Sequence, residues 1–346
     1  MTQTLFKYIF KMQLKAIIFV SVSVFFLILL FDFAEVTRKY PISNLDETVF
    51  SIKLSLLRTP STFCEIFHYT YFITATFSLW NLCRSHQITI LKSTGRSPQQ
   101  ILYPFLSFAT FIALIWLFVM HPTGLFLETL YNKSISSGTV SETNRDVWID
   151  FPPNNQMIFI KTIYGNKIEG LYIFDTKQGA RIFARRASIE KSVWNLENVT
   201  TVNDDKITHV DAMKFFSGVS LNLIKLISKS PRNHDVYYLY KIYKIQKKNQ
   251  VTLRLYELEL HKLLANCFSF ILFALIAAII CFPINRYKTK THIAIKVIST
   301  AIFLRFSNNM LESLAHGGAI PVQLACWAIM LILACISIAI LIWREV

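Results

Sequence analysis

Residues 16–36 read AIIFVSVSVFFLILLFDFAEV, a stretch with no charged residue before Asp32. Similar apolar runs follow near 63–82 and 101–120, and three more lie near 263–284, 293–314 and 321–343. A helix needs about 20 mostly apolar residues to cross the hydrocarbon core of a bilayer. The sequence therefore predicts six transmembrane helices in two blocks of three, separated by a polar insert.

The composition agrees with an integral membrane protein. The chain has 346 residues, 53% of them hydrophobic, and a formal net charge of +15. The mean hydropathy is +0.42. The basic residues are spread over loops and the insert without a nucleic-acid-binding motif, so we expect no nucleic-acid partner.

The six cysteines lie in or beside apolar runs: Cys64, Cys83, Cys267, Cys281, Cys326 and Cys335. Their spacing matches neither a zinc site nor a redox motif. We therefore expect buried, small apolar side chains at all six, and no metal or cofactor.

The basic residues predict the orientation of the helices. With the N-terminus inside, eleven lie in inner segments: Lys7, Lys11, Lys15, Arg84, Lys92, Arg96, Arg286, Lys288, Lys290, Lys296 and Arg344. Four lie in short outer loops: Arg38, Lys39, Lys53 and Arg58. Because cytoplasmic loops are enriched in basic residues, we expect both termini in the cytoplasm and the insert outside it. The first helix is expected to be retained, since its apolar run has no signal-peptide cleavage pattern.

The insert carries the pattern of a β domain. Short segments rich in β-branched and aromatic residues occur at 157–161, 168–174, 181–187 and 219–223, and turn signals at 164–166, 177–179 and 203–205 separate them. We predict an α+β membrane protein: helices at 1–121, a β-sandwich or jellyroll-like domain at 122–254, and helices at 255–346. Residues 237–245 are expected to be helical. His209 and Asp211 lie close in sequence, but no nucleophile motif accompanies them, so no active site is predicted.

Residues 84–98 are expected to form a short cytoplasmic helix between two spans. Gly95 can end this helix in a left-handed conformation. Pro98 suits the start of the next helix, where its missing N–H costs little. Such an element is either an ordinary connection or one that transmits motion from a soluble partner into the membrane.

Of the six apolar runs, the fifth, at 293–314, carries the most polar side chains. Arg305, Asn309 and Glu312 fall on one helical face. An arginine near the middle of the bilayer costs at least about 2.5–3.5 kcal/mol if it faces lipid. We therefore expect Arg305 to face a cavity or a neighbouring helix. A direct pair with Glu312, two turns away, is left open.

Several motifs resemble those of the LptF/LptG permease family. The strongest is the inner loop RSHQITILKSTGRSP at 84–98; others are Val147-Trp148, Ala187 with WNLENV at 194–199, and GGAIP at 317–321 followed by Trp327. The resemblance covers the whole chain. The first and last motifs, together with DFAE at 32–35, favour LptG over LptF.

The resemblance implies a permease subunit of an ATP-binding cassette transporter. Such a subunit extracts lipopolysaccharide from the inner membrane and passes it to a periplasmic bridge. The implied partners are an LptB-like ATPase, an LptF-like second permease half, and LptA-like and LptC-like periplasmic and single-span proteins. The chain is not itself an enzyme by this reading, because its sequence has no Walker A motif.

The resemblance also assigns residues to roles. Coupling to the ATPase falls to Gln87, Lys92, Gly95 and Arg96, although the family usually has a glutamate where this chain has Gln87. Contact with the phosphorylated substrate falls to Arg38, Lys39, Arg145 and Arg305, since arginine and lysine are the usual partners of phosphate.

Two other functions fit the same layout. One is a membrane-anchored scaffold or sensor with a periplasmic β domain that binds a ligand. The other is a lipoprotein-releasing permease, although that class usually has four spans and a large domain after the first. Co-purification of a nucleotide-binding subunit distinguishes a transporter from a scaffold.

Overall fold

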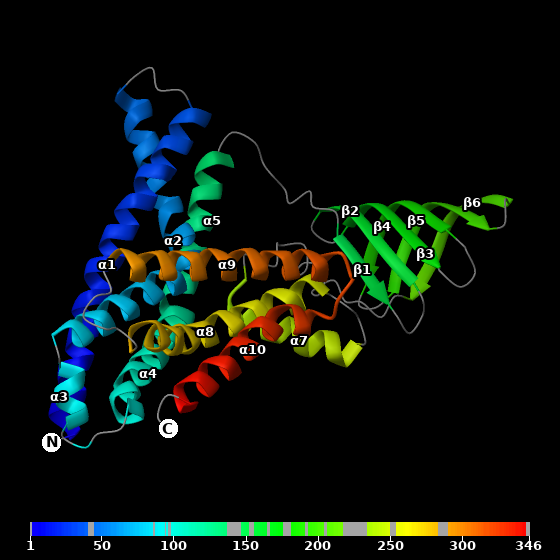
Figure 1. Ribbon diagram of the computed structural model, residues 1–346. Coiled ribbons are helices and arrows are strands. Elements are labelled where there is room, and N and C mark those ends of the chain that lie inside the picture. The colour runs from blue at the N-terminus through cyan, green and yellow to red at the C-terminus, as the bar shows by residue number, and fades with distance from the viewer. Residues whose placement is uncertain are drawn as a thin grey trace. The chain divides into compact units, whose positions relative to one another are not determined.

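The computed structural model describes residues 2–40, 45–85, 87–93, 95, 98–136, 147–151, 156–164, 167–175, 181–190, 193–203, 206–216, 234–249, 254–282 and 290–343. The chain divides into two compact units, one of Met1–Ser134 with His261–Val346 and the other of Ile135–Leu260. Helices dominate the first unit and an antiparallel sheet the second (Figure 1).

The helical unit begins with α1 (Thr2–Lys39), α2 (Leu45–Arg84), α3 (Gln87–Ser93), α4 (Pro98–Ile115), the π-helix η1 (Trp116–Met120) and α5 (His121–Ser136). It ends with α8 (Arg254–Cys281), α9 (Lys290–His316) and α10 (Val322–Trp343). Helix α8 starts in the second unit and continues into the first. Each of the six apolar runs lies mainly in one of these long helices or, near 101–120, in α4 and η1.

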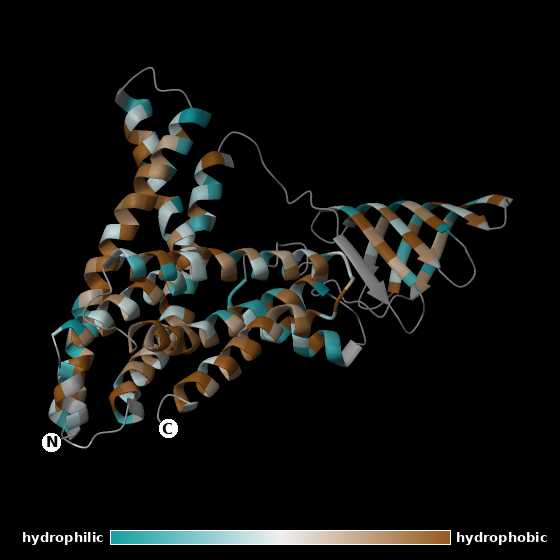
Figure 2. Cartoon of the chain, viewed as in Figure 1, coloured by the Kyte–Doolittle hydropathy of each residue, from teal (hydrophilic) through white to brown (hydrophobic). Residues whose placement is uncertain are grey.

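Four helical segments of the described residues are long and apolar enough to cross a membrane: Gln3–Lys39, Gln100–Ile135, Arg254–Cys281 and Val322–Trp343. Figure 2 shows apolar residues along these segments. Helices α2 and α9 are also long, but they carry more polar side chains, among them Arg305 and Glu312 on α9. Four apolar spans are therefore established by length and composition, while the count of six stays a prediction.

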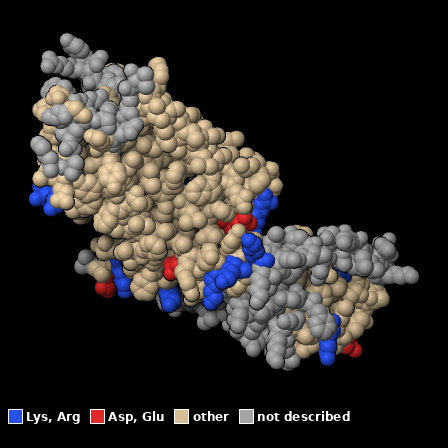
Figure 3. All heavy atoms as spheres, turned by 90° about the horizontal axis from the view of Figure 1, so that it is seen from below, with Lys and Arg blue, Asp and Glu red and all other residues tan. Residues whose placement is uncertain are grey.

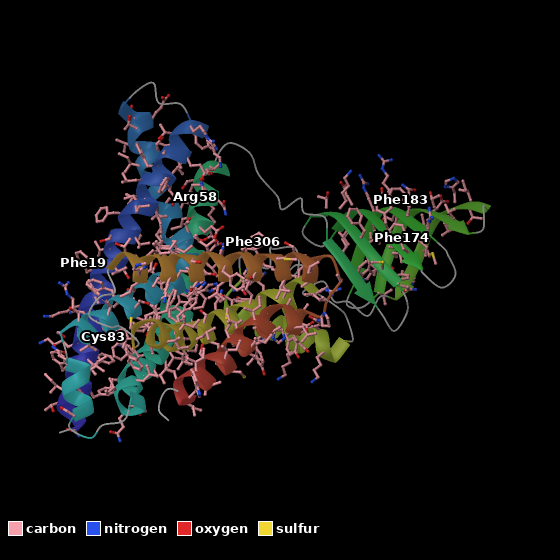
Figure 4. All side chains as sticks on the ribbon, viewed as in Figure 1. Phe19, Arg58, Cys83, Phe174, Phe183 and Phe306 are labelled. Atoms are coloured by element: carbon pink, nitrogen blue, oxygen red, sulfur yellow. The ribbon has the colours of Figure 1, made fainter. Side chains whose placement is uncertain are left out.

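The interior of the helical unit is aromatic. Phe72 on α2 stacks on Phe273 of α8 with ring centroids 4.9 Å apart, and Tyr71 lies 5.5 Å from Phe270. By contrast, only 11% of the most apolar window of α1 is buried, against 56% for α8. Exposed apolar side chains such as Phe19 and Phe306 cover the outside (Figure 4). Figure 3 shows a broad face of this unit with few charged side chains. Such a surface suits a lipid environment.

One expectation for the cysteines is wrong. Cys64 and Cys281 are buried, as expected, but Cys335 is exposed. It lies on α10, most of whose apolar window is not covered by the rest of the protein. An apolar run predicts insertion in a membrane, but it does not distinguish a side chain that faces protein from one that faces lipid.

The second unit confirms the predicted β structure. Strands β1 (Val147–Phe151), β2 (Gln156–Tyr164), β3 (Lys167–Asp175), β4 (Arg181–Glu190), β5 (Val193–Asn203) and β6 (Lys206–Phe216) form one antiparallel sheet in chain order. The described strands thus make a meander, so a second sheet and the jellyroll connectivity stay predictions. Residues 219–223, expected as another strand, lie outside the described residues. Helix α7 (Val236–Asn249) confirms the helix expected at 237–245.

The sheet has a break in its side-chain alternation. Leu171, Ala184 and Val199 are buried in neighbouring strands, and so are Ile168, Ala187 and Leu196, three residues further along each strand. Regular strands repeat every two residues. Between the two rows, Gly170 has φ +70° and Asn198 has φ +53°. In β3 and β5 these left-handed residues allow both rows to face the buried side.

We predict that Gly170→Ala destabilises the sheet by about 1–2 kcal/mol, because a left-handed backbone is unfavourable for a residue with a Cβ. That Cβ would also lie 3.0 Å from the Cβ of Lys161. Hydrogen–deuterium exchange of the full chain should show faster exchange in β2–β4. Glu169→Ala, an exposed neighbour, serves as the control. Equal exchange in both variants would contradict the prediction.

Candidate functional site

The short helix expected between two spans is α3, which contacts both α2 and α4. Ile88 is buried and Ile90 is 60% exposed, so the helix has an inner and an outer face. Gly95 follows with φ +78°, which confirms the left-handed conformation predicted for it. Lys92 lies within α3 but its side chain is outside the described residues, as is Arg96.

Gln87 begins α3 and is bound to the first helix. Its Nε2 lies 3.3 Å from the hydroxyl of Tyr8, and its Oε1 lies 3.4 Å from the same oxygen. Both distances are at the long end of the hydrogen-bonding range. The amide therefore tethers α3 to α1 within the chain. The sequence offered no sign of this partner, because Tyr8 is 79 residues away.

A second polar cluster joins the C-terminal end of α1 to α2. Arg58 on α2 places Nη1 3.0 Å from Oε1 of Glu35 and Nε 3.7 Å from Oδ1 of Asp32 (Figure 4). The hydroxyl of Thr59 donates to Oδ2 of Asp32 at 3.0 Å. Lys39, one turn after Glu35, lies 2.8 Å from the same Glu35 oxygen. We call these five residues the α1–α2 network.

Helix α5 is held against α2 next to this network. The hydroxyl of Ser61 donates to Oε2 of Glu128 at 2.8 Å. One turn along, Gly124 packs so closely that a Cβ there would lie 3.1 Å from Sγ of Cys64. The indole N–H of Trp116 in η1 donates to the carbonyl oxygen of Cys64 at 2.9 Å. These contacts fix the position of α5 along α2.

The predicted substrate residues are not gathered at one point. Arg38 is exposed in the last turn of α1, and Lys39 is paired with Glu35. Arg305 is exposed on α9 and lies close to the hydroxyl of Tyr69 on α2. Arg145 lies outside the described residues. Tyr69 is three turns along α2 from Arg58, or roughly 16 Å at 1.5 Å per residue.

Glu312 does not pair with Arg305 in the structure. Its Oε1 lies 2.6 Å from Nζ of Lys262 on α8 and 3.8 Å from Nε2 of His316. Beside this pair, the indole of Trp327 on α10 donates to Nδ1 of His261 at 3.3 Å. Arg305 is exposed, and its predicted place in a cavity or against a neighbouring helix stays a prediction. The roles of Arg58 and Lys262 as ion-pair partners were not predicted from the sequence.

The family model of the lipopolysaccharide export system permease LptF/LptG matches residues 7–344, nearly the whole chain. A search of curated proteins finds no significant match. The chain therefore belongs to the LptF/LptG family of lipopolysaccharide export permeases, which makes it a transporter component and a multi-pass protein of the inner membrane.

Proposed function

We propose that the chain is the LptG-like permease subunit of an ATP-binding cassette transporter that extracts lipopolysaccharide from the inner membrane. The family match over residues 7–344 carries this proposal. A separate LptB-like ATPase supplies the energy, and an LptF-like chain supplies the second half of the transport path. An LptC-like single-span protein and an LptA-like bridge receive the lipid in the periplasm.

In this proposal both termini are cytoplasmic, and residues 1–121 and 255–346 each contribute three spans. Residues 122–254 form the periplasmic domain that hands the lipid on. Gln87, Lys92, Gly95 and Arg96 form the coupling segment that the ATPase moves. The attachment of α3, through buried Ile88 and the long hydrogen bond between Gln87 and Tyr8, supports transmission of that motion into α1.

Substrate contact is assigned to Arg38, Lys39, Arg145 and Arg305. Arg38 and Lys39 end α1 with exposed side chains, as contact with a phosphorylated headgroup requires. Arg305, in the span of α9, lies close to Tyr69 of α2. Arg145 precedes the first strand and would meet the lipid on its way to the β domain.

The central test is purification of the chain from its native membrane, followed by mass spectrometry of subunits and bound lipid. We expect an ATPase, a second permease and lipopolysaccharide. Recovery of the chain without any nucleotide-binding subunit would favour the scaffold or sensor instead. Recovery of bound lipoprotein would favour a lipoprotein-releasing permease.

We predict that the double variant Arg38→Glu/Lys39→Glu weakens lipopolysaccharide binding, because two attractive charges become repulsive toward phosphate. Photo-crosslinking of lipopolysaccharide to the protein should fall, and so should the stimulation of ATP hydrolysis by lipopolysaccharide. We expect each to fall roughly tenfold, the change that 1.4 kcal/mol of binding free energy represents. Lys53→Glu, on α2, is a control that makes one of these charge reversals away from the end of α1. Full activity of the double variant would remove these residues from the substrate site.

A further inference from the structure

One carboxylate oxygen of the α1–α2 network is shared by two cations. Oε1 of Glu35 lies 2.8 Å from Nζ of Lys39 and 3.0 Å from Nη1 of Arg58. Lys39 belongs to α1 and Arg58 to α2, so the shared oxygen bridges the two helices. Lys39 is also one of the residues that the proposed function assigns to the phosphorylated substrate.

The two carboxylates of the network differ in accessibility. The side chain of Asp32 is 7% exposed and is fixed by the hydroxyl of Thr59. The side chain of Glu35 is 34% exposed, that of Arg58 29% and that of Lys39 50%. Asp32 thus holds Arg58 in place from the buried side, whereas Glu35 binds the cations on the side that a ligand can reach.

A phosphate group would need the same two cations. Arginine binds phosphate through paired N–H donors and lysine binds it as a point charge. Here both cations already have a counter-ion, so an anion must displace Glu35 or tolerate its negative charge nearby. Removal of a competing or repulsive element raises affinity most for the ligands that the element was excluding.

We propose that Arg58 and Lys39 form a headgroup site for phosphorylated lipid and that Glu35 is a built-in competitor for it. A ligand must carry enough negative charge to displace Glu35 from the two cations. A headgroup with two phosphates does so more readily than the single phosphate of an ordinary phospholipid. Glu35 thereby favours bis-phosphorylated lipid over the abundant phospholipids and eases release. This inference rests on the proposed function, and it adds Arg58 to the substrate residues.

The test compares wild-type protein with Glu35→Gln, purified as the full chain with its co-purifying subunits. Binding of fluorescent bis-phosphorylated lipid A and of fluorescent phosphatidylglycerol is titrated in detergent. An exposed ion pair changes an equilibrium constant by up to a factor of about five. Glu35 forms two such pairs, one with Lys39 and one with Arg58. We expect Glu35→Gln to tighten lipid A binding roughly three- to tenfold and to tighten phosphatidylglycerol binding by a larger factor. The ratio of the two affinities, which measures the preference for lipid A, should therefore fall.

Three further variants separate charge from packing. Glu35→Asp keeps the charge and should bind as wild type does. Glu35→Gln/Arg58→Gln should lose the gain of the single variant. Glu65→Gln removes an exposed carboxylate elsewhere on α2 and should change neither affinity.

Two results have distinct meanings. If Glu35→Gln binds both lipids as Glu65→Gln does, or more weakly, the inference is overturned and the network only joins two helices. That result leaves the proposed function intact. If wild-type protein itself fails to bind lipid A, the proposed function fails and the inference fails with it.

Discussion

Replacement of Gly95 with proline is expected to uncouple ATP hydrolysis from lipid extraction. Gly95 has φ +78°, and proline fixes φ near −65°, so the turn that ends α3 cannot form. Among the described residues, apart from its chain neighbours, no atom lies within 4 Å of the position a Cβ would take, so we attribute the effect to the backbone and not to crowding. Gly95 and α3 both belong to the proposed coupling segment. A changed path of the chain after α3 should therefore disconnect the ATPase from the spans.

The measurement is lipid extracted per ATP hydrolysed in proteoliposomes that contain the purified complex. We expect Gly95→Pro to reduce this ratio by about tenfold or more, the change produced by each 1.36 kcal/mol in a barrier. Gly95→Ala should have a smaller effect, since a left-handed alanine costs about 1–2 kcal/mol. Gly317→Ala is the matched control, because its Cβ would make only ordinary contacts at 3.7 Å. An unchanged ratio in Gly95→Pro would refute the coupling role.

Replacement of Trp116 with alanine is expected to lower the free energy of unfolding of the helical unit by about 3–5 kcal/mol, the usual cost of removing a large buried aromatic side chain. Trp116 is 1% exposed, and its ring centroid lies 6.0 Å from that of Phe270. Its N–H also donates to the carbonyl oxygen of Cys64. The substitution therefore leaves a cavity and removes a hydrogen bond between η1 and α2.

Unfolding by sodium dodecyl sulfate in mixed micelles measures this loss. Trp116→Phe keeps most of the ring but not the hydrogen bond, so it should cost about 1–3 kcal/mol. Trp343→Ala, at a position 80% exposed at the end of α10, should change stability little. Equal destabilisation by Trp116→Ala and Trp343→Ala would show that the contact of Trp116 with α2 does not contribute to the free energy of unfolding.

The helices, strands and turns that depend on the local pattern of residues could be predicted from the sequence. Long apolar runs indicated the helices, short β-branched runs indicated the strands, and the position of Gly95 indicated the end of α3. The π-helix at 116–120 could not be predicted, because its residues read as one more apolar turn. The shift of alternation at Gly170 and Asn198 was equally hidden, since strand patterns assume a period of two.

The amino-acid pattern alone indicated a membrane permease: the apolar runs predicted which segments enter the bilayer, and the loop at 84–98 pointed to the family. It also placed Lys39 one turn after Glu35, where a pair within one helix forms by local geometry. The pairing of Arg58 with Glu35, and that of Glu312 with Lys262, 50 residues away in the chain, became visible only once the helices were packed together. The run of residues fixes the length of a helix, but the rotation of that helix and its choice of neighbour arise from packing. Those pairings decide which cations already have a counter-ion within the protein.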